Sequence, residues 1–186
     1  MFFMDLLPVF LKIGGRRVLL VGGGSVASSK LDALRRAGAD VEVVAPVVHP
    51  SIHAAGVRVH ERPFAPADLD GVWLVVAAAT PAVNAAVARE AERRRIFVNA
   101  VDDPPNASAY LGGVIRRAGV TIAISTSGEA PALAGVLREG IDALLPADLE
   151  RWSVCARSLR AGWKEQQVPM ADRRPLLIKA LKDLYP

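Results

Sequence analysis

The chain has 186 residues, of which 52% are hydrophobic and 23% are charged, and its net charge is +4. No apolar run reaches the roughly 20 residues of a membrane-spanning helix, which excludes a membrane protein and favours a soluble, cytoplasmic one. The apolar N-terminus, MFFMDLLPVFLKIGG, lacks the basic start and cleavage site of a signal peptide, so we expect it to belong to the fold. The single cysteine, Cys155, excludes an internal disulfide and a thiolate cluster.

The first half of the chain alternates between predicted strands and helices. A continuous apolar run at residues 18–21 predicts a strand buried on both faces. A helix follows it, with apolar residues at 27, 31 and 34 and a stop at Gly38. Further strands are expected at residues 41–45, 57–60, 72–77 and 96–99, with a helix at 81–93. This order predicts an α/β fold with a Rossmann-like, doubly wound parallel sheet.

After about residue 105 the pattern changes to a hairpin followed by helices. Residues 108–115 and 120–126 predict extended segments whose connection is too short for a crossover. Apolar residues at 133, 136, 137, 141 and 144 then predict an amphipathic helix between Pro131 and Pro146. The basic tail at 149–185 predicts helices with a break near Pro169. Its cations indicate either a solvated face or a surface for a ligand with several carboxylates, and the lack of interleaved aromatics disfavours nucleic acid.

The stretch Gly22-Gly23-Gly24-Ser25-Val26-Ala27 joins the first predicted strand to the first helix. This GxGxxA pattern is typical of dinucleotide binding. The first glycine makes the tight turn, the third lets the backbone approach a phosphate, and Ala27 stands where the helix meets the strand. The start of the helix would face a pyrophosphate. Packing is the alternative reason for such glycines, and the flanking strand and helix favour the dinucleotide.

The end of the second predicted strand lacks the acid that usually holds the adenosine ribose. The sequence there is Val44-Ala45-Pro46-Val47, and Glu42 lies too early, inside the strand. No arginine at this strand end marks a pocket for a 2′-phosphate. The pattern therefore favours NAD over NADP.

Two aspartates follow the last strand of the predicted sheet, in Asn99-Ala100-Val101-Asp102-Asp103-Pro104-Pro105. This edge of the sheet is where a nicotinamide would lie, so a carboxylate here suits a general base. The alternative is an ordinary turn, because aspartate before proline is a frequent turn sequence. Asp103 is the better turn former and Asp102 the better catalytic candidate.

A second polar segment, Ser125-Thr126-Ser127-Gly128-Glu129, precedes the helix that starts near Pro131. Its hydroxyl groups suit a pocket for an anion or a substrate carboxylate. The alternative is a helix cap made by Ser127 or Glu129. The three histidines do not have the spacing of metal ligands, and no resident metal site is expected.

Several sequence blocks, in order, resemble one known family. They are Leu7-Pro8-Val9-Phe10, VGGGSVASSK, AGADVEVVAP, Arg62-Pro63-Phe64, Ala78-Ala79-Thr80 with Asn84, RRIFVNAVDDP, STSGEAPALAGVLRE and Leu144-Leu145-Pro146. The chain resembles the precorrin-2 dehydrogenases of the siroheme-synthase N-terminal type, some of which are also sirohydrochlorin ferrochelatases. The match departs at Thr126, where a serine is frequent, and at Ser127, where glycine is common.

The resemblance implies oxidation of the tetrapyrrole precorrin-2 to sirohydrochlorin with NAD, in siroheme or cobalamin biosynthesis, with Fe²⁺ or Co²⁺ as a possible further substrate. It implies a homodimer with a dinucleotide domain at residues 1–112, a dimerisation segment at 113–147 and a helical segment at 148–186. We expect the preceding methylation to belong to another protein. A non-catalytic NAD-sensing module is the alternative, but such a module would not need the AVDDP segment or the basic tail.

The resemblance also assigns roles to individual residues. Asp102 is the expected catalytic residue. The cofactor is expected at Gly22, Gly24, Ser25, Val26, Pro46, Val47 and Thr80. The substrate is expected at Asn99, Ser125, Thr126 and Ser127.

Overall fold

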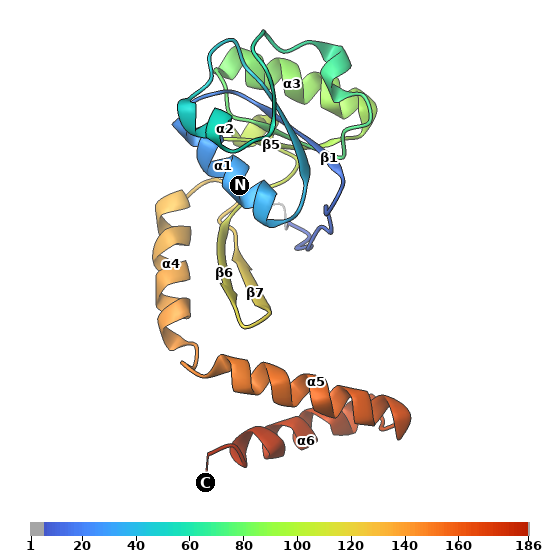
Figure 1. The fold of residues 1–186 in the computed structure, drawn as a ribbon. Helices are drawn as coiled ribbons and strands as arrows, with labels where there is room; N and C mark the ends of the chain where they lie inside the picture. Colours follow the sequence, from blue (N-terminus) through green and yellow to red (C-terminus); the bar gives the residue numbers. More distant parts are fainter. Residues whose placement is uncertain (1–5, 186) are drawn as a thin grey trace. The chain divides into compact units, whose positions relative to one another are not determined.

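The computed structural model describes residues 6–185, which form two compact units (Figure 1). The first unit runs to Leu111 and includes Ser127–Glu129, and the second comprises Gly112–Thr126 and the chain from Ala130 onward. The first five residues of the apolar N-terminus lie outside the described part. Of the rest of that segment, residues 6–12 are exposed and Ile13 is buried.

The first unit is built on a five-stranded parallel sheet with the order β3-β2-β1-β4-β5. Its strands are β1 (Arg17–Val21), β2 (Asp40–Val44), β3 (Arg58–His60), β4 (Leu74–Ala77) and β5 (Phe97–Ala100). The chain moves outward from β1 to β3 and then returns to the other side of β1 with β4. This reversal of strand order confirms the doubly wound α/β fold and places a topological switch point between β1 and β4.

Helices cover both faces of this sheet, and each face has its own apolar core. The helices are α1 (Ser25–Arg36), α2 (Pro50–Ala54) and α3 (Pro81–Arg94), with 3₁₀ turns η1 (Pro66–Leu69) and η2 (Pro104–Asn106). Leu20 packs on one face with α1 and α2 residues such as Leu31 and Ile52. Leu19 packs on the other face with Val87 of α3. Because alternate residues of β1 enter opposite cores, residues 18–21 of the strand must all be apolar.

The second unit contains an antiparallel hairpin and three helices (Figure 1). They are β6 (Gly113–Arg117), β7 (Val120–Ile124), α4 (Pro131–Leu144), α5 (Leu149–Glu165) and α6 (Met170–Lys182). The turn at Ala118 and Gly119 has positive φ at both residues, which matches the twist of the two strands. Arg117 donates hydrogen bonds to the carbonyl oxygens of Asp142 and Pro146, at 3.0 and 2.9 Å, and so ties the hairpin to the end of α4.

Most apolar residues of the second unit are not buried. Its buried hydrophobic residues, within the described chain, are Ile115, Ala134 and Leu149. The large apolar residues of α4 are mainly exposed, namely Leu133, Val136, Leu137 and Leu144. Within residues 6–185, no helix combines the length and the apolar character needed to cross a membrane.

Candidate functional site

The first glycine of the turn after β1 is required by the close approach of two strands. Gly22 has a φ of +124°, and its N–H donates to the Val44 carbonyl oxygen at 3.0 Å. A Cβ on Gly22 would lie 2.2 Å from the carbonyl oxygen of Ala78, at the end of β4. A side chain is therefore excluded by backbone, which cannot move aside without separating the strands.

The second glycine has a packing role that the motif did not reveal. A Cβ on Gly23 would lie 2.0 Å from the carbonyl oxygen of Val47. The Gly23 carbonyl oxygen also accepts a 2.7 Å hydrogen bond from the His49 N–H. These contacts bring the loop after β2 against the glycine turn. The triple glycine was the only sequence signal for this contact.

The space where a Cβ of the third glycine would lie is empty. Gly24 has a φ of −83°, and no atom lies within 4 Å of an added Cβ. It is the N-cap of α1, and it has no side chain to cap the helix. The first turn contains no acid, and Ser25 and Val26 are exposed. The amides of this turn and the helix dipole therefore suit an anion, and these features fit the pyrophosphate of a dinucleotide.

The loop after β2 lies against the glycine turn at Gly23. Pro46 and Val47 are exposed there, and Val47 is 81% accessible to solvent. A chain of polar groups stands nearby: the Ser51 hydroxyl lies 2.7 Å from both the Ser28 hydroxyl and the His49 Nδ1. These hydroxyls are neutral hydrogen-bonding groups of the kind that suit a ribose.

Glu42, the acid that stands inside β2, is used for structure. It is 5% exposed, and Arg17 of β1 and Arg58 of β3 form ion pairs with it at 3.0 and 2.9 Å. His60 Nε2 lies 3.2 Å from its Oε2. The hydrogen bond from Arg17 is the main cause that lowers the pKa of Glu42 below its ordinary value. Glu42 thus links three strands, away from the end of the sheet.

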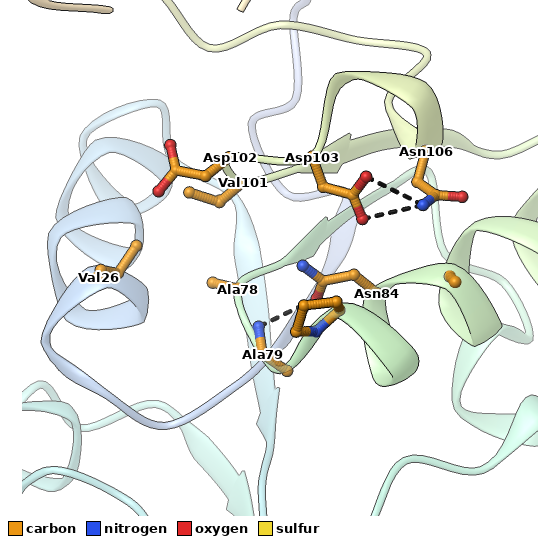
Figure 2. A pocket seen from close by; sticks show the side chains of 10 residues that line it. Val26, Ala78, Ala79, Asn84, Val101, Asp102, Asp103 and Asn106 are labelled. Carbon is orange, nitrogen blue, oxygen red and sulfur yellow. Dashed lines mark hydrogen bonds between the residues drawn. The ribbon is translucent and has the colours of Figure 1, made fainter.

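A cavity of about 590 Å³ opens at the carboxyl ends of β4 and β5, beside the switch point (Figure 2). Its lining residues come from α1, the turn after β4, α3 and the segment after β5. They are Val26, Ala78, Ala79, Pro81, Asn84, Ala85, Val101, Asp102, Asp103 and Asn106. The position and mixed lining are those of a ligand site in an open α/β sheet.

The two aspartates at this cavity have different environments. The Asp103 carboxylate accepts hydrogen bonds from Asn106 Nδ2 at 3.0 and 2.9 Å, and its backbone carbonyl accepts from the Asn106 N–H at 3.1 Å. Asp103 therefore stabilises η2, as a turn former does. Asp102 is exposed and has a φ of +54°, and within residues 6–185 its carboxylate has no bonded partner. It is the available acceptor at the cavity.

Asn84 is a cavity residue that the site prediction omitted, although it stood in one of the resembling blocks. It is only 3% exposed, and its Oδ1 accepts a hydrogen bond from the Ala79 N–H at 3.1 Å. Its place one turn before Val87, on the face of α3 that is buried, was the sequence signal available for it. Thr80, a predicted cofactor residue, is the exposed N-cap of α3 and makes no side-chain cap bond.

Asn99 belongs to β5 and is not one of the residues that line the cavity. It is buried, and its Nδ2 donates to the Ala109 carbonyl oxygen at 2.9 Å. Its Oδ1 is buried and accepts no hydrogen bond from the described residues. The structure gives Asn99 a role in holding the segment after η2 against β5. Its predicted contact with substrate stays a prediction.

The predicted serine-rich segment is divided between the two units. Ser127 belongs to the first unit and has a φ of +55°. A Cβ on the next residue, Gly128, would lie 3.1 Å from Pro104, so this segment borders the turn that follows Asp103. Ser125 and Thr126 belong to the second unit. The Thr126 hydroxyl accepts a 3.3 Å hydrogen bond from the Ala130 N–H. Ala130 is the N-cap of α4, and within residues 6–185 no side chain makes a cap hydrogen bond to this helix, so the cap expected from Ser127 or Glu129 is not formed.

The strand order, the glycine turn and the cavity together define a dinucleotide-binding domain of the Rossmann type. Comparison with family models agrees: residues 9–113 match a family described as putative NAD(P)-binding. The chain belongs to this family.

Individual relatives make the family more specific. Siroheme synthase 1 of Serratia proteamaculans is 41% identical over 92% of this chain, and siroheme synthase 3 of Aeromonas hydrophila is 44% identical over 92%. The chain spans 37% and 38% of these curated relatives. A solved structure of SirC, a precorrin-2 dehydrogenase, has a TM-score of 0.73 at 26% identity, covering 97% of this chain and 92% of that one. The resemblance found in the sequence blocks is thereby confirmed.

Proposed function

We propose that this chain oxidises precorrin-2 to sirohydrochlorin with NAD, as a step of siroheme or cobalamin biosynthesis. Its similarity to siroheme synthases and to a precorrin-2 dehydrogenase supports the pathway. The single observation that carries the chemistry is the unengaged Asp102 carboxylate at the cavity beside the glycine turn.

In this proposal a bound nicotinamide dinucleotide supplies the hydride acceptor. The first-turn amides of α1 would hold its pyrophosphate, and the apolar side chains of Ala78 and Val101 would lie beside its nicotinamide. Asp102 takes the proton that the substrate loses together with the hydride, so that two electrons and two hydrogens leave the tetrapyrrole in total. Asp102 has a left-handed backbone conformation in the turn after β5, and it lines the cavity from that turn.

NAD is preferred over NADP in this proposal because of the loop after β2. Pro46 and Val47 carry no charge, and the nearby hydroxyl chain of Ser28 and Ser51 suits ribose hydroxyls better than a 2′-phosphate. Titration calorimetry with the two dinucleotides tests this preference. We expect NAD to bind at least tenfold more tightly, and equal affinities would contradict it.

We extend the proposal to the insertion of Fe²⁺ or Co²⁺, with the metal as a substrate. Asp102 would accept the pyrrole protons that the entering metal displaces. Among the described residues, no group of three or more His, Cys, Asp or Glu side chains is arranged to hold a metal ion. Adding either metal ion after oxidation is complete measures this step, and a rate equal to the enzyme-free rate would contradict the extension.

We propose further that the chain acts as a homodimer. Val136 and Leu137 on α4 are 65% and 42% exposed, and exposed apolar side chains of this kind support an interface with a second copy. Leu137→Asp should convert the dimer to a monomer in light-scattering measurements. A wild-type mass equal to one chain would contradict the dimer.

The oxidation is tested in an anaerobic assay of precorrin-2 and NAD that follows NADH and the spectrum of sirohydrochlorin. Asp102→Asn should lower kcat by about 10² to 10⁴ while NAD still binds. Asp103→Asn is the matched control, because it makes the same change of charge one residue away. If Asp102→Asn retains full turnover, the catalytic assignment is wrong. If the wild-type chain binds NAD without oxidising precorrin-2, an NAD-sensing module becomes the better interpretation.

A further inference from the structure

The observation behind this inference is the fixed orientation of the Asn84 side-chain amide. A backbone N–H can only donate, so the hydrogen bond from Ala79 identifies the atom that receives it as Oδ1. The Nδ2 group is then the one presented to the cavity. Figure 2 shows this nitrogen on the side facing the segment that carries Val101 and Asp103. No described residue accepts a hydrogen bond from it.

This donor opens into the cavity. The Asn84 residue is 97% buried, but its Nδ2 is not among the buried side-chain atoms that lack a partner, so the nitrogen is reached from the cavity. Apolar residues such as Ala78, Ala85 and Val101 line the cavity together with polar ones. Alanine or leucine at this position would leave the Ala79 N–H without its acceptor, so that hydrogen bond accounts for the amide oxygen of Asn84 and leaves its nitrogen unused. An oriented amide N–H in a ligand-sized cavity indicates that a ligand supplies the acceptor.

The place of the cavity identifies which part of a dinucleotide would reach it. Gly24, where we propose that the pyrophosphate binds, follows Gly23, which the loop after β2 contacts through Val47. Val26, in the first turn of α1, lines the cavity and connects it with the pyrophosphate position. A dinucleotide whose adenosine lies over β2 therefore extends its nicotinamide into the cavity. The flat ring suits the apolar walls, and its carboxamide oxygen is a hydrogen-bond acceptor.

We propose that Asn84 Nδ2 binds the carboxamide oxygen of the nicotinamide and so fixes the rotation of the ring beneath Asp102. This inference rests on the proposed dinucleotide function and deepens it. Asn84 is a positioning residue for the hydride acceptor, and Asp102 keeps the proton transfer. The contact contributes to the affinity for the nicotinamide half and leaves the adenosine half unaffected.

The experiment compares the binding of NAD with that of ADP-ribose, which lacks the nicotinamide. Asn84→Asp keeps the shape and the acceptor for the Ala79 N–H but removes the donor. Calorimetry should show NAD affinity about 3- to 10-fold lower in this variant, with ADP-ribose affinity within twofold of wild type. Thionicotinamide adenine dinucleotide, whose sulfur is a weaker acceptor, should bind wild type less tightly than NAD does. Asn84→Asp should bind NAD and thionicotinamide adenine dinucleotide with nearly equal affinity.

Asn106→Ala is the matched control, because Asn106 lines the same cavity but its Nδ2 is engaged by Asp103. An equal loss of the NAD preference in both asparagine variants would overturn the specific contact, as would equal losses for NAD and ADP-ribose in Asn84→Asp. A wild-type chain that binds neither ligand would overturn this inference and the dinucleotide function together. A chain that shows the expected binding ratios but no oxidation of precorrin-2 would refute the proposed reaction alone.

Discussion

The two compact units differ in how they bury their apolar residues. In the first, the central strands lie between two helical layers, and Leu19, Leu20 and Val76 have at most 1% of their surface exposed. In the second, long helices bury few large side chains, and Leu144 is 84% exposed. The first unit therefore contains the core that specifies its fold, whereas the apolar faces of the second are left for contacts outside the unit.

The largest effect should come from a leucine truncation in the first unit. Leu20→Ala removes a fully buried side chain from the core beneath α1, which should lower the free energy of unfolding by about 2 to 5 kcal/mol. Leu144→Ala makes the same truncation at an exposed position of α4 and should change it by no more than about 0.5 kcal/mol in the single chain. Urea unfolding followed by circular dichroism measures both.

Leu20→Ala and Leu144→Ala also test whether the apolar face of α4 stays exposed when copies of the chain associate. If Leu144→Ala becomes as destabilising as Leu20→Ala at high protein concentration but not at low concentration, a second copy covers α4. If the two variants are equally destabilising at all concentrations, the exposed face is covered within the chain and the comparison is wrong.

A smaller effect is expected when the ion pairs of the two units are compared. Glu42→Gln leaves Arg17 without its carboxylate, whereas Arg58 keeps its ion pair with Asp40 at 2.8 Å. The substitution should lower the free energy of unfolding by about 2 kcal/mol, because both cations keep some access to water. Asp142→Asn removes a half-exposed partner of Arg117 and should cost at most about 1 kcal/mol. Equal losses in urea unfolding would contradict the distinction between a buried and an exposed pair.

The Glu42 cluster also predicts a pH dependence of the first unit. The folded-state pKa of Glu42 is lower than its unfolded value of about 4.5, so its stabilisation is complete above that value. It is lost as the pH falls from 4.5 through the lower folded-state pKa. The difference in unfolding free energy between wild type and Glu42→Gln should therefore shrink between pH 6 and pH 3. A difference that stays constant, or that grows as the pH falls, would contradict this linkage.

The sequence predicted the strands and long helices of the first unit because their signals are local. The apolar run in β1, the glycine turn and the spacing of α1 each lie within a short stretch. The elements it missed are α2, η1 and η2, all of which begin with a proline at the first position. That proline was an available signal of a helix start. Strand β6 begins at Gly113, later than the expected residue 108, because the preceding segment lies against β5 through Asn99 and Ser108.

The candidate site was harder to predict where a role depends on contacts between elements. Gly23 is constrained by Val47, which lies more than twenty residues away in the chain. Asn84 gains its importance only when α3 packs at the end of β4 and its Oδ1 meets the Ala79 N–H. For Asp102 and Asp103 the sequence was sufficient, because Asp103 precedes a proline; the contact with Asn106 agrees with Asp103 as the turn former.

The smallest predicted effect concerns the polar contacts that hold the end of the second unit. The Tyr185 hydroxyl accepts a hydrogen bond from Trp152 Nε1 at 2.6 Å and donates to the Asp148 carboxylate, at 2.8 Å. Tyr185→Phe should cost less than about 1 kcal/mol, because this cluster is exposed and water replaces the lost bonds. Hydrogen exchange should nevertheless become faster in α6, since that helix has no buried residue of its own. Tyr110→Phe, which removes only a 3.5 Å contact in the first unit, should leave exchange in α6 unchanged. Unchanged exchange in both variants would mean that apolar contacts between α5 and α6, rather than this polar cluster, keep the last helix in place.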